Sequence, residues 1–227
     1  MNFLDESSVV ETFFSEFSGL NRPNIRPVED LDEMKEVYRL THTSYVSSGY
    51  SDCHPSNMLI HYPYFDHIPE STILIALMHG KIVGSVSLTI DGPNGLTVDE
   101  DFKEDCDKIR AEGKPLATVW RLVVDESHRN QRTIVMNLIN EIVHRLLKNK
   151  ISNCLFAVNP KHANVYQRML NMQVVATRTT TNGLCNAPAV LLRGDPEKIP
   201  YHGVHGQTDE NFNALHFLLT TGDYIGL

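Results

Sequence analysis

The 227-residue sequence has few cysteines, no C-x-x-C pair and no long apolar run. Its four cysteines, Cys53, Cys106, Cys154 and Cys185, are far apart, which argues against a zinc ribbon or a disulfide scaffold. No apolar run approaches the roughly 18 residues of a membrane span, and the acidic N-terminus lacks the positive region of a signal peptide. We therefore expect a cytoplasmic protein with reduced thiols and no membrane span.

Metal-ligand patterns and serine-nucleophile motifs are also missing. The eleven histidines include His202 and His205, but this pair stands in a Gly-rich segment without cysteine or carboxylate ligands at the usual spacing. There is no Gly-x-Ser-x-Gly motif. We expect no metal, and we read Cys154 as a packed thiol in a strand.

Positive charge is scarce overall, since the formal net charge is −8. This argues against nucleic acid as the main partner. The charge is uneven, however, because residues 126–168 hold seven Lys or Arg and two acids, 7 − 2 = +5. Such a stretch can bind an anionic ligand, or it can be a solvated helix face. Its cations are Arg129, Arg132, Arg145, Lys148, Lys150, Lys161 and Arg168.

Hydrophobic periodicity predicts alternating helices and strands. Helices are expected from Asp30, over 98–112, over 133–148, where a wide apolar stripe runs, and from Asn159 to about Asn171. Strands are expected over 72–78 and 81–90, joined by His79-Gly80, and over 117–124, 154–158, 174–181 and 187–192. Residues 46–70 should be an irregular loop. The order indicates an α/β domain around one mixed sheet.

The most informative segment runs from Trp120 through Ile134. It reads as a strand, a loop rich in hydrogen-bond donors and a helix N-terminus, where exposed amides and the helix dipole favour an anion. Arg129 and Arg132 would add two permanent positive charges. The segment therefore predicts a phosphate site, to which we assign Arg129, Gln131, Arg132 and Thr133.

This strand and loop resemble the GNAT acyltransferase fold. The resemblance implies that Leu122, Val123 and Val124 pair with a pantetheine arm and that a main-chain N–H near Val123 polarises the thioester carbonyl. The small residues of the family's phosphate loop are absent from Arg129-Asn-Gln-Arg-Thr-Ile134. Without glycine the backbone cannot approach a pyrophosphate closely, which favours acyl-phosphopantetheine on acyl carrier protein over acyl-CoA as donor. The +5 stretch would then dock that acidic carrier.

The segment after Val158 resembles the GNAT strand–loop–helix that carries a tyrosine. This implies that Asn159 contacts the donor and that Tyr166 protonates the departing thiolate, a role suited to a phenol. A core tyrosine on an amphipathic helix is the alternative.

Over residues 36–195 the chain resembles the long-chain N-acyl amino acid synthases (the FeeM-like family), relatives of the acyl-homoserine-lactone synthases. The resemblance implies transfer of a fatty acyl group from acyl carrier protein to an amino acid amine. It is carried by Tyr38-Arg39, Tyr45–Tyr50, Asp66-His-Ile-Pro, Gly84–Leu88, Asp91–Leu96, Leu116–Asp125 and Asn186–Val190.

Two charged residues expected from the family pattern are absent, a Glu near Thr118 and an Arg near Ser87. If this Glu and this Arg form an ion pair in relatives, a chain that lacks both has no buried charge left unmatched. Three hypotheses therefore stand: a carrier-protein-dependent N-acyltransferase, an acyl-CoA-dependent acyltransferase or lactone-type signal synthase, and a non-catalytic acyl- or protein-binding module.

The attacking amine must lose a proton, and Asp91, Asp66 and Glu100 are the candidate bases. Arg121 stands in an apolar strand and needs a carboxylate partner, either Asp66 or the carboxylate of the acceptor. The expected organisation is an N-terminal extension over 1–25, a GNAT-like domain over 26–200 and a C-terminal helical extension over 201–227. That extension is expected to pack on the domain, to cover an acyl tunnel as a lid or to form a dimer contact.

Overall fold

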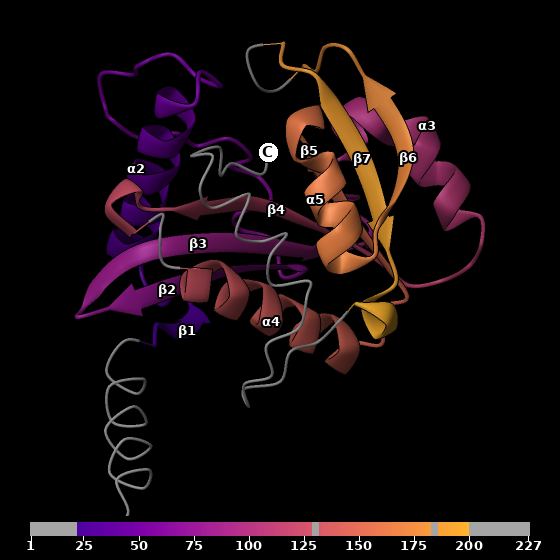
Figure 1. Cartoon of the computed structure of the whole chain (residues 1–227), viewed down its shortest axis with the longest axis horizontal. Coiled ribbons are helices and arrows are strands. Elements are labelled where there is room, and N and C mark those ends of the chain that lie inside the picture. The colour runs from indigo at the N-terminus through magenta and orange to yellow at the C-terminus, as the bar shows by residue number, and fades with distance from the viewer. Residues whose placement is uncertain (1–21, 129–131, 183–185, 200–227) are drawn as a thin grey trace, which may run out of the picture.

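A computed structural model describes residues 22–128, 132–182 and 186–199. Seven strands and four α-helices alternate along these residues much as the sequence predicts (Figure 1). The strands are β1 (Asn24–Pro27), β2 (Ser71–Met78), β3 (Lys81–Ile90), β4 (Leu116–Val124), β5 (Asn153–Val158), β6 (Gln173–Arg178) and β7 (Ala189–Gly194). The helices are α2 (Leu31–Ser47), α3 (Asp99–Arg110), α4 (Arg132–Lys148) and α5 (Pro160–Leu170), with 3-10 turns at Glu126–His128 and Pro196–Lys198.

All seven strands form one sheet in the order β1-β2-β3-β4-β5-β7-β6. Neighbours are antiparallel except β4 and β5, which run parallel. The mixed sheet expected from the sequence is therefore confirmed, and it is mostly antiparallel. Strand β1, which follows an Asn-Arg-Pro segment, was not predicted, because four residues are too few for an alternating pattern to stand out.

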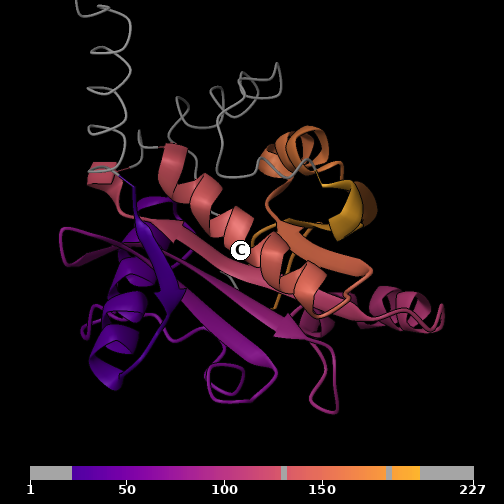
Figure 2. The same cartoon turned by 90° about the horizontal axis from the view of Figure 1, so that it is seen from below.

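Helices cover both faces of the sheet (Figure 2). Helices α4 and α5 share the largest core with β2–β5 and β7. On the opposite face, α3 packs on Leu155 and Leu191, and α2 packs on Ile75 and Val123. Among the described helices, none is long and apolar enough to cross a bilayer.

Local sequence accounts for the element ends. The Asp30 carboxylate caps α2 by accepting from two backbone N–H groups, and Asn159 caps α5 ahead of Pro160 at the first helical position. The turn between β2 and β3 has positive φ at both His79 and Gly80, the conformation that a two-residue hairpin requires. Residues 48–70, between α2 and β2, contain neither helix nor strand, as expected. The predicted 1–25 and 201–227 extensions fall almost wholly outside the described residues.

Candidate functional site

The β3–β4 ladder contains a bulge. Ser87 pairs with Trp120 and Ser85 with Val123, so that Arg121 and Leu122 together face Val86. Arg121 has φ of +53°, a left-handed conformation that is unusual for a side chain of this size. A bulge bends a strand and disrupts its ladder locally, and this one begins two residues after Val119, the last residue of β4 that pairs with β5.

Strands β4 and β5 pair over only four residues each, Leu116–Val119 against Asn153–Phe156. Beyond Val119 the two halves of the sheet diverge: β4 continues across the view while β7 and β6 turn away (Figure 1). Asp125 N–H donates to Val83 O at 2.9 Å. Backbone N–H groups point alternately to the two sides of a strand. Val123 N–H therefore points toward β3, as Asp125 N–H does, and Val124 N–H points toward the β5 side. We call this divergence beyond Val119 the seam.

Helices α4 and α5 both begin at the seam's open end, because each follows the carboxyl end of β4 or β5. Arg129 and Gln131 lie outside the described residues, Arg132 is the first residue of α4, and Thr133 is exposed. Asn159 accepts from Lys161 N–H at 3.1 Å, so its side-chain oxygen already serves as a helix cap. Two helix N-termini at one edge form an environment suited to an anion.

The guanidinium of Arg121 is buried against Asp66 from the 48–70 loop, with side-chain exposures of 1% and 0%. Arg121 Nη2 donates to Asp66 Oδ1, and Nη1 reaches Oδ2 at 3.3 Å. Tyr38 Oη also donates to Oδ2, at 2.9 Å, and the guanidinium lies 4.4 Å from the Trp120 ring. Burial, with the negative charge of Asp66 beside it, raises the pKa of Tyr38 to about 12. The structure thus brings together Arg121 and Asp66.

Small hydroxyl residues occupy the two positions where the family pattern predicts charge. Ser87 Oγ accepts from Arg121 Nε at 3.2 Å and from Nη2 at 3.0 Å. Thr118 Oγ1 donates to Leu155 O at 3.3 Å, across the four paired residues of β4 and β5. Both residues are fully buried and hydrogen-bonded, so the chain accommodates the loss of Glu and Arg without an unmatched charge at these positions.

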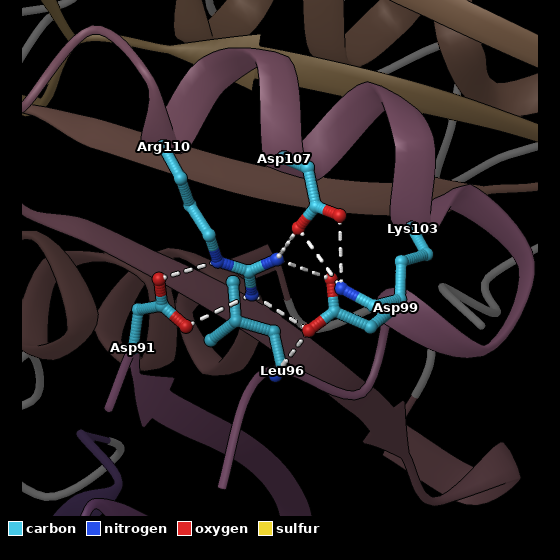
Figure 3. Close-up of polar contacts among 6 residues, drawn as sticks. All are labelled: Asp91, Leu96, Asp99, Lys103, Asp107 and Arg110. Atoms are coloured by element: carbon cyan, nitrogen blue, oxygen red, sulfur yellow. Dashed lines mark hydrogen bonds and ion pairs between the residues drawn. The ribbon is translucent and has the colours of Figure 1, made fainter. Parts of the chain in front are cut away.

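Asp91 lies in a separate cluster at the end of β3 (Figure 3). Its two oxygens accept from Arg110 Nε at 2.7 Å and Nη2 at 2.9 Å, and Asp99 accepts from the same guanidinium. These hydrogen bonds raise the pKa of Arg110. The structure does not bring Asp91 to the Arg121–Asp66 pair. Glu100, the third candidate base, is exposed and bonds to Tyr62.

Tyr166 of α5 lies beside the seam on the α4–α5 face of the sheet. It is buried, and its ring packs edge-on against Phe156, the last β5 residue paired with β4, at a centroid distance of 4.8 Å. Burial raises its pKa above the usual value. The phenol is therefore protonated at neutral pH and can donate a hydrogen bond.

A narrow, wholly apolar cavity lies between the sheet and α4. Its free volume is about 30 Å³, and one end of it reaches the seam at Val119 and Phe156. Its walls carry no polar group that a substrate could pair with. The lining residues are Val86, Val119, Leu122, Ile139, Ile142, Val143, Leu146, Cys154, Phe156, Leu170, Met172 and Ile199.

A second narrow pocket, with a free volume of about 30 Å³, lies on the other face of the sheet under the 48–70 loop. It mixes aromatic and polar side chains and also reaches Val119, so the two cavities adjoin the same residue from opposite faces. Sequence reasoning missed this pocket, although the length of the loop was a signal for function. The lining residues are His61, Tyr62, Thr97, Val98, Asp101, Phe102, Val119, Trp120, Ala157, Thr181 and Ala189.

The basic stretch does not form one patch among the described residues. Lys161 is exposed in the first turn of α5, at the open end of the seam. Lys148 and Lys150 are exposed at the far end of α4, before β5 begins. The six residues of β5 separate the two ends by roughly 20 Å. No cluster of three His, Cys, Asp or Glu side chains that could hold a metal ion occurs among residues 22–128, 132–182 and 186–199.

A divergent mixed sheet with paired helices at its open end defines the GNAT class of acyltransferases, and solved structures share the fold. FeeM, an N-acyl amino acid synthase from uncultured soil microbes, has a TM-score of 0.67 at 21% identity, covering 79% of this chain and 96% of its own. The AHL synthase LasI scores 0.58 at 14% identity, covering 82% and 98%. An N-acetyltransferase from Staphylococcus aureus Mu50 scores 0.53 at 16%, covering 77% and 98%.

The family model of the N-acyl amino acid synthase FeeM matches residues 36–195, which is well over half of the chain. The chain therefore belongs to the FeeM family of N-acyl amino acid synthases and is an acyltransferase. No curated protein sequence matches it.

Proposed function

We propose that the protein transfers a long-chain fatty acyl group from the phosphopantetheine thioester of acyl carrier protein to the amine of an amino acid, in the cytoplasm. One observation carries the proposal: an apolar cavity and a polar pocket approach Val119 from opposite faces of the sheet, where β4 and β5 part. A thioester held in the seam would keep its acyl chain on one side and meet its acceptor on the other.

The acyl chain belongs to the cavity under α4 because that cavity is apolar throughout. Burial of each methylene group there contributes roughly 0.8 kcal/mol. The cavity is narrow, so a long chain widens it by moving unbranched or flexible side chains such as Met172 and Leu170. The length of the acyl chain that the protein accepts is then limited by how far α4 can move away from the sheet.

The chemical step is attack of a neutral amine on the thioester carbonyl. The C–N bond forms and the C–S bond breaks; the amine nitrogen releases one proton to water, and the departing sulfur takes one from a donor that water then reprotonates. Val124 N–H faces the seam and would stabilise charge on the carbonyl oxygen. Tyr166, protonated beside Phe156, would donate to the leaving sulfur.

Arg121 and Asp66 are assigned a positioning role in this proposal. Their buried pair fixes the bulge of β4 and ties the 48–70 loop over the seam. Asp91, committed to Arg110, would hold the end of β3 to α3 instead of moving protons.

The donor would enter at the edge formed by the N-termini of α4 and α5. The single negative charge of a phosphodiester is complementary to the two helix N-termini and to the positive side chain of Lys161. The segment over 129–132 lacks the glycines that close approach to a pyrophosphate needs. The carrier is acidic, so Lys161 and the start of α4 would form its docking edge.

The deciding experiment offers the full-length protein palmitoyl-loaded carrier protein or palmitoyl-CoA, each with a mixture of the twenty amino acids, and identifies products by mass spectrometry. An N-acyl amino acid formed only from the carrier-protein donor is the expected result and names the acceptor. Product only from CoA would overturn the choice of donor. No product from either, with acyl carrier protein still bound, would leave a binding module.

A further inference from the structure

The polar pocket under the 48–70 loop contains two buried polar atoms without partners. His61 and Thr97 both line it, and His61 Nε2 and Thr97 Oγ1 make no hydrogen bond with any residue that the structure describes. Thr97 is 3% exposed. A buried polar group without a partner costs about 1–3 kcal/mol, so two of them on residues that line one pocket require an explanation that packing does not supply.

The charged side chain that lines the pocket is an acid, while the guanidinium groups of Arg121 and Arg178 lie 4.4 Å from the Trp120 ring and 4.8 Å from the Phe102 ring. Asp101 lines the pocket, and no lysine or arginine is among its lining residues in the described ranges. Asp101 Oδ1 accepts from Asn182 N at 2.8 Å and from Asn182 Nδ2 at 3.1 Å. Its other oxygen accepts no hydrogen bond among the described residues. A cation is the complementary ligand for such a group.

The imidazole of His61 is buried against two aromatic rings. It stacks on Tyr62 with ring centroids 4.0 Å apart and meets Tyr45 edge-on at 6.4 Å. Burial, aided by the charge of Arg121, lowers its pKa to about 4, so the ring is neutral at pH 7. With its proton on Nδ1, the buried Nε2 accepts. The remaining walls, from Tyr62, Phe102 and Trp120, suit an apolar or aromatic body.

We propose that this pocket binds the acyl acceptor by its amino group, with Nε2 of His61 and Oγ1 of Thr97 accepting N–H hydrogen bonds and Asp101 balancing the charge. The acceptor class is a primary amine with an apolar body, and the carboxylate of an amino acid would point out of the pocket. The assignment rests on the proposed acyl transfer, because it places the amine beside Val119, where the cavity for the acyl chain also ends.

Binding of small probes to the full-length protein tests the site without any acyl donor. The probes are 2-phenylethylamine, which has the amine alone, and phenylacetate, which has the carboxylate alone, each titrated by calorimetry. The amine should bind and the acid should not. Equal or tighter binding of phenylacetate would overturn the proposal.

Variants separate a ligand site from a structural role. His61→Phe and Thr97→Val should each weaken 2-phenylethylamine binding at least fivefold, and His61→Gln, which keeps an acceptor near Nε2, should stay within threefold of the parent. Thr97→Val should not lower the melting temperature, because its hydroxyl has no partner to lose. Thr41→Val is the matched control: it replaces a buried threonine of α2 outside the pocket, whose hydroxyl donates to Val37 O at 2.7 Å. It should leave amine binding unchanged while lowering stability.

The outcomes distinguish this inference from the proposed function. If acyl transfer occurs and His61→Phe leaves both amine binding and the acceptor KM unchanged, the site assignment fails and the function stands. If the amine binds as described and no donor yields product, the function fails and the site stands.

Discussion

At the scale of single residues, the site depends on Arg121. Its backbone forms the bulge of β4, and its side chain joins that strand to the 48–70 loop through Asp66. The sequence predicted Asp66 as one of two partners for Arg121, because a buried arginine needs a carboxylate. The left-handed backbone of Arg121 could not be predicted, since nothing in its residue type favours that conformation.

Asp66→Asn should lower the free energy of unfolding by about 3 kcal/mol, because it leaves Arg121 as an uncompensated buried charge. Urea denaturation measures the change. Glu36→Gln breaks the exposed i,i+3 pair with Arg39 and should cost less than about 1 kcal/mol. Equal losses of unfolding free energy for the two substitutions would show that the buried Arg121–Asp66 pair stabilises the fold no more than an exposed pair does.

Tyr166→Phe should lower kcat about 10²-fold and leave both KM values nearly unchanged, because only the proton donor for the leaving sulfur is removed. Steady-state kinetics with acyl carrier protein as donor tests this. Tyr64→Phe, at a site 58% exposed, serves as the control and should retain full activity. A change confined to KM would place Tyr166 in binding and not in catalysis.

His61 should make stability depend on pH above the range where carboxylates titrate. Its pKa is about 4 in the folded protein, against an ordinary value of 6.5. Between these values the unfolded chain binds a proton that the folded chain does not, so the free energy of unfolding falls as pH falls from 6.5 toward 4. His61→Phe should flatten the profile between pH 6.5 and 5 in urea titrations. An unchanged slope would count against a buried, neutral imidazole.

At the scale of elements, most helices and strands followed from periodicity and caps. The apolar stripe of α4 and the Asn-Pro start of α5 were predicted within a residue or two. The position and lining of the two cavities were not predicted, because a cavity arises between elements distant in sequence. His61, Tyr62 and Thr97 lie in loops whose residue types also suit ordinary turns, and only the unusual length of the 46–70 segment pointed to function.

Val143→Phe should shift product chain length toward shorter acyl groups, because Val143 lines the cavity under α4. A mixture of carrier proteins loaded with chains of different lengths, analysed by mass spectrometry, gives the distribution. Overpacking a core costs about 1–3 kcal/mol in itself. Val135→Phe on the same helix, buried in the same core outside the cavity, controls for that loss and should leave the distribution unchanged.

At the scale of the whole molecule, the described lysines of the 126–168 stretch lie at opposite ends of β5. The sequence predicted one basic docking stretch, but β5 runs between Lys148 and Lys161 and separates them. A count of charge along the chain cannot show this, because a helix and a strand carry neighbouring residues in sequence to opposite ends of the fold.

Lys161→Glu should raise the KM for acyl carrier protein several-fold at low salt, with kcat and the acceptor KM unchanged, because it reverses charge at the open end of the seam. Lys148→Glu makes the same change in net charge at the far end and should have little effect. Kinetics at two ionic strengths test the pair. Equal effects of both would indicate that net charge, not a docking edge, governs the encounter.

The short pairing of β4 with β5 also has a consequence for how the chain can be divided. Strands β1–β4 all precede residue 149 and β5–β7 all follow residue 152, so the described chain passes between the two halves of the sheet once. Lys150, exposed and in a left-handed conformation, marks that crossing. Trypsin cleavage after Lys150 would leave one fragment with β1–β4 and another with β5–β7, and the two would still meet along Leu116–Val119 and Asn153–Phe156. The fold thus contains a natural position for reassembly from two separately made pieces.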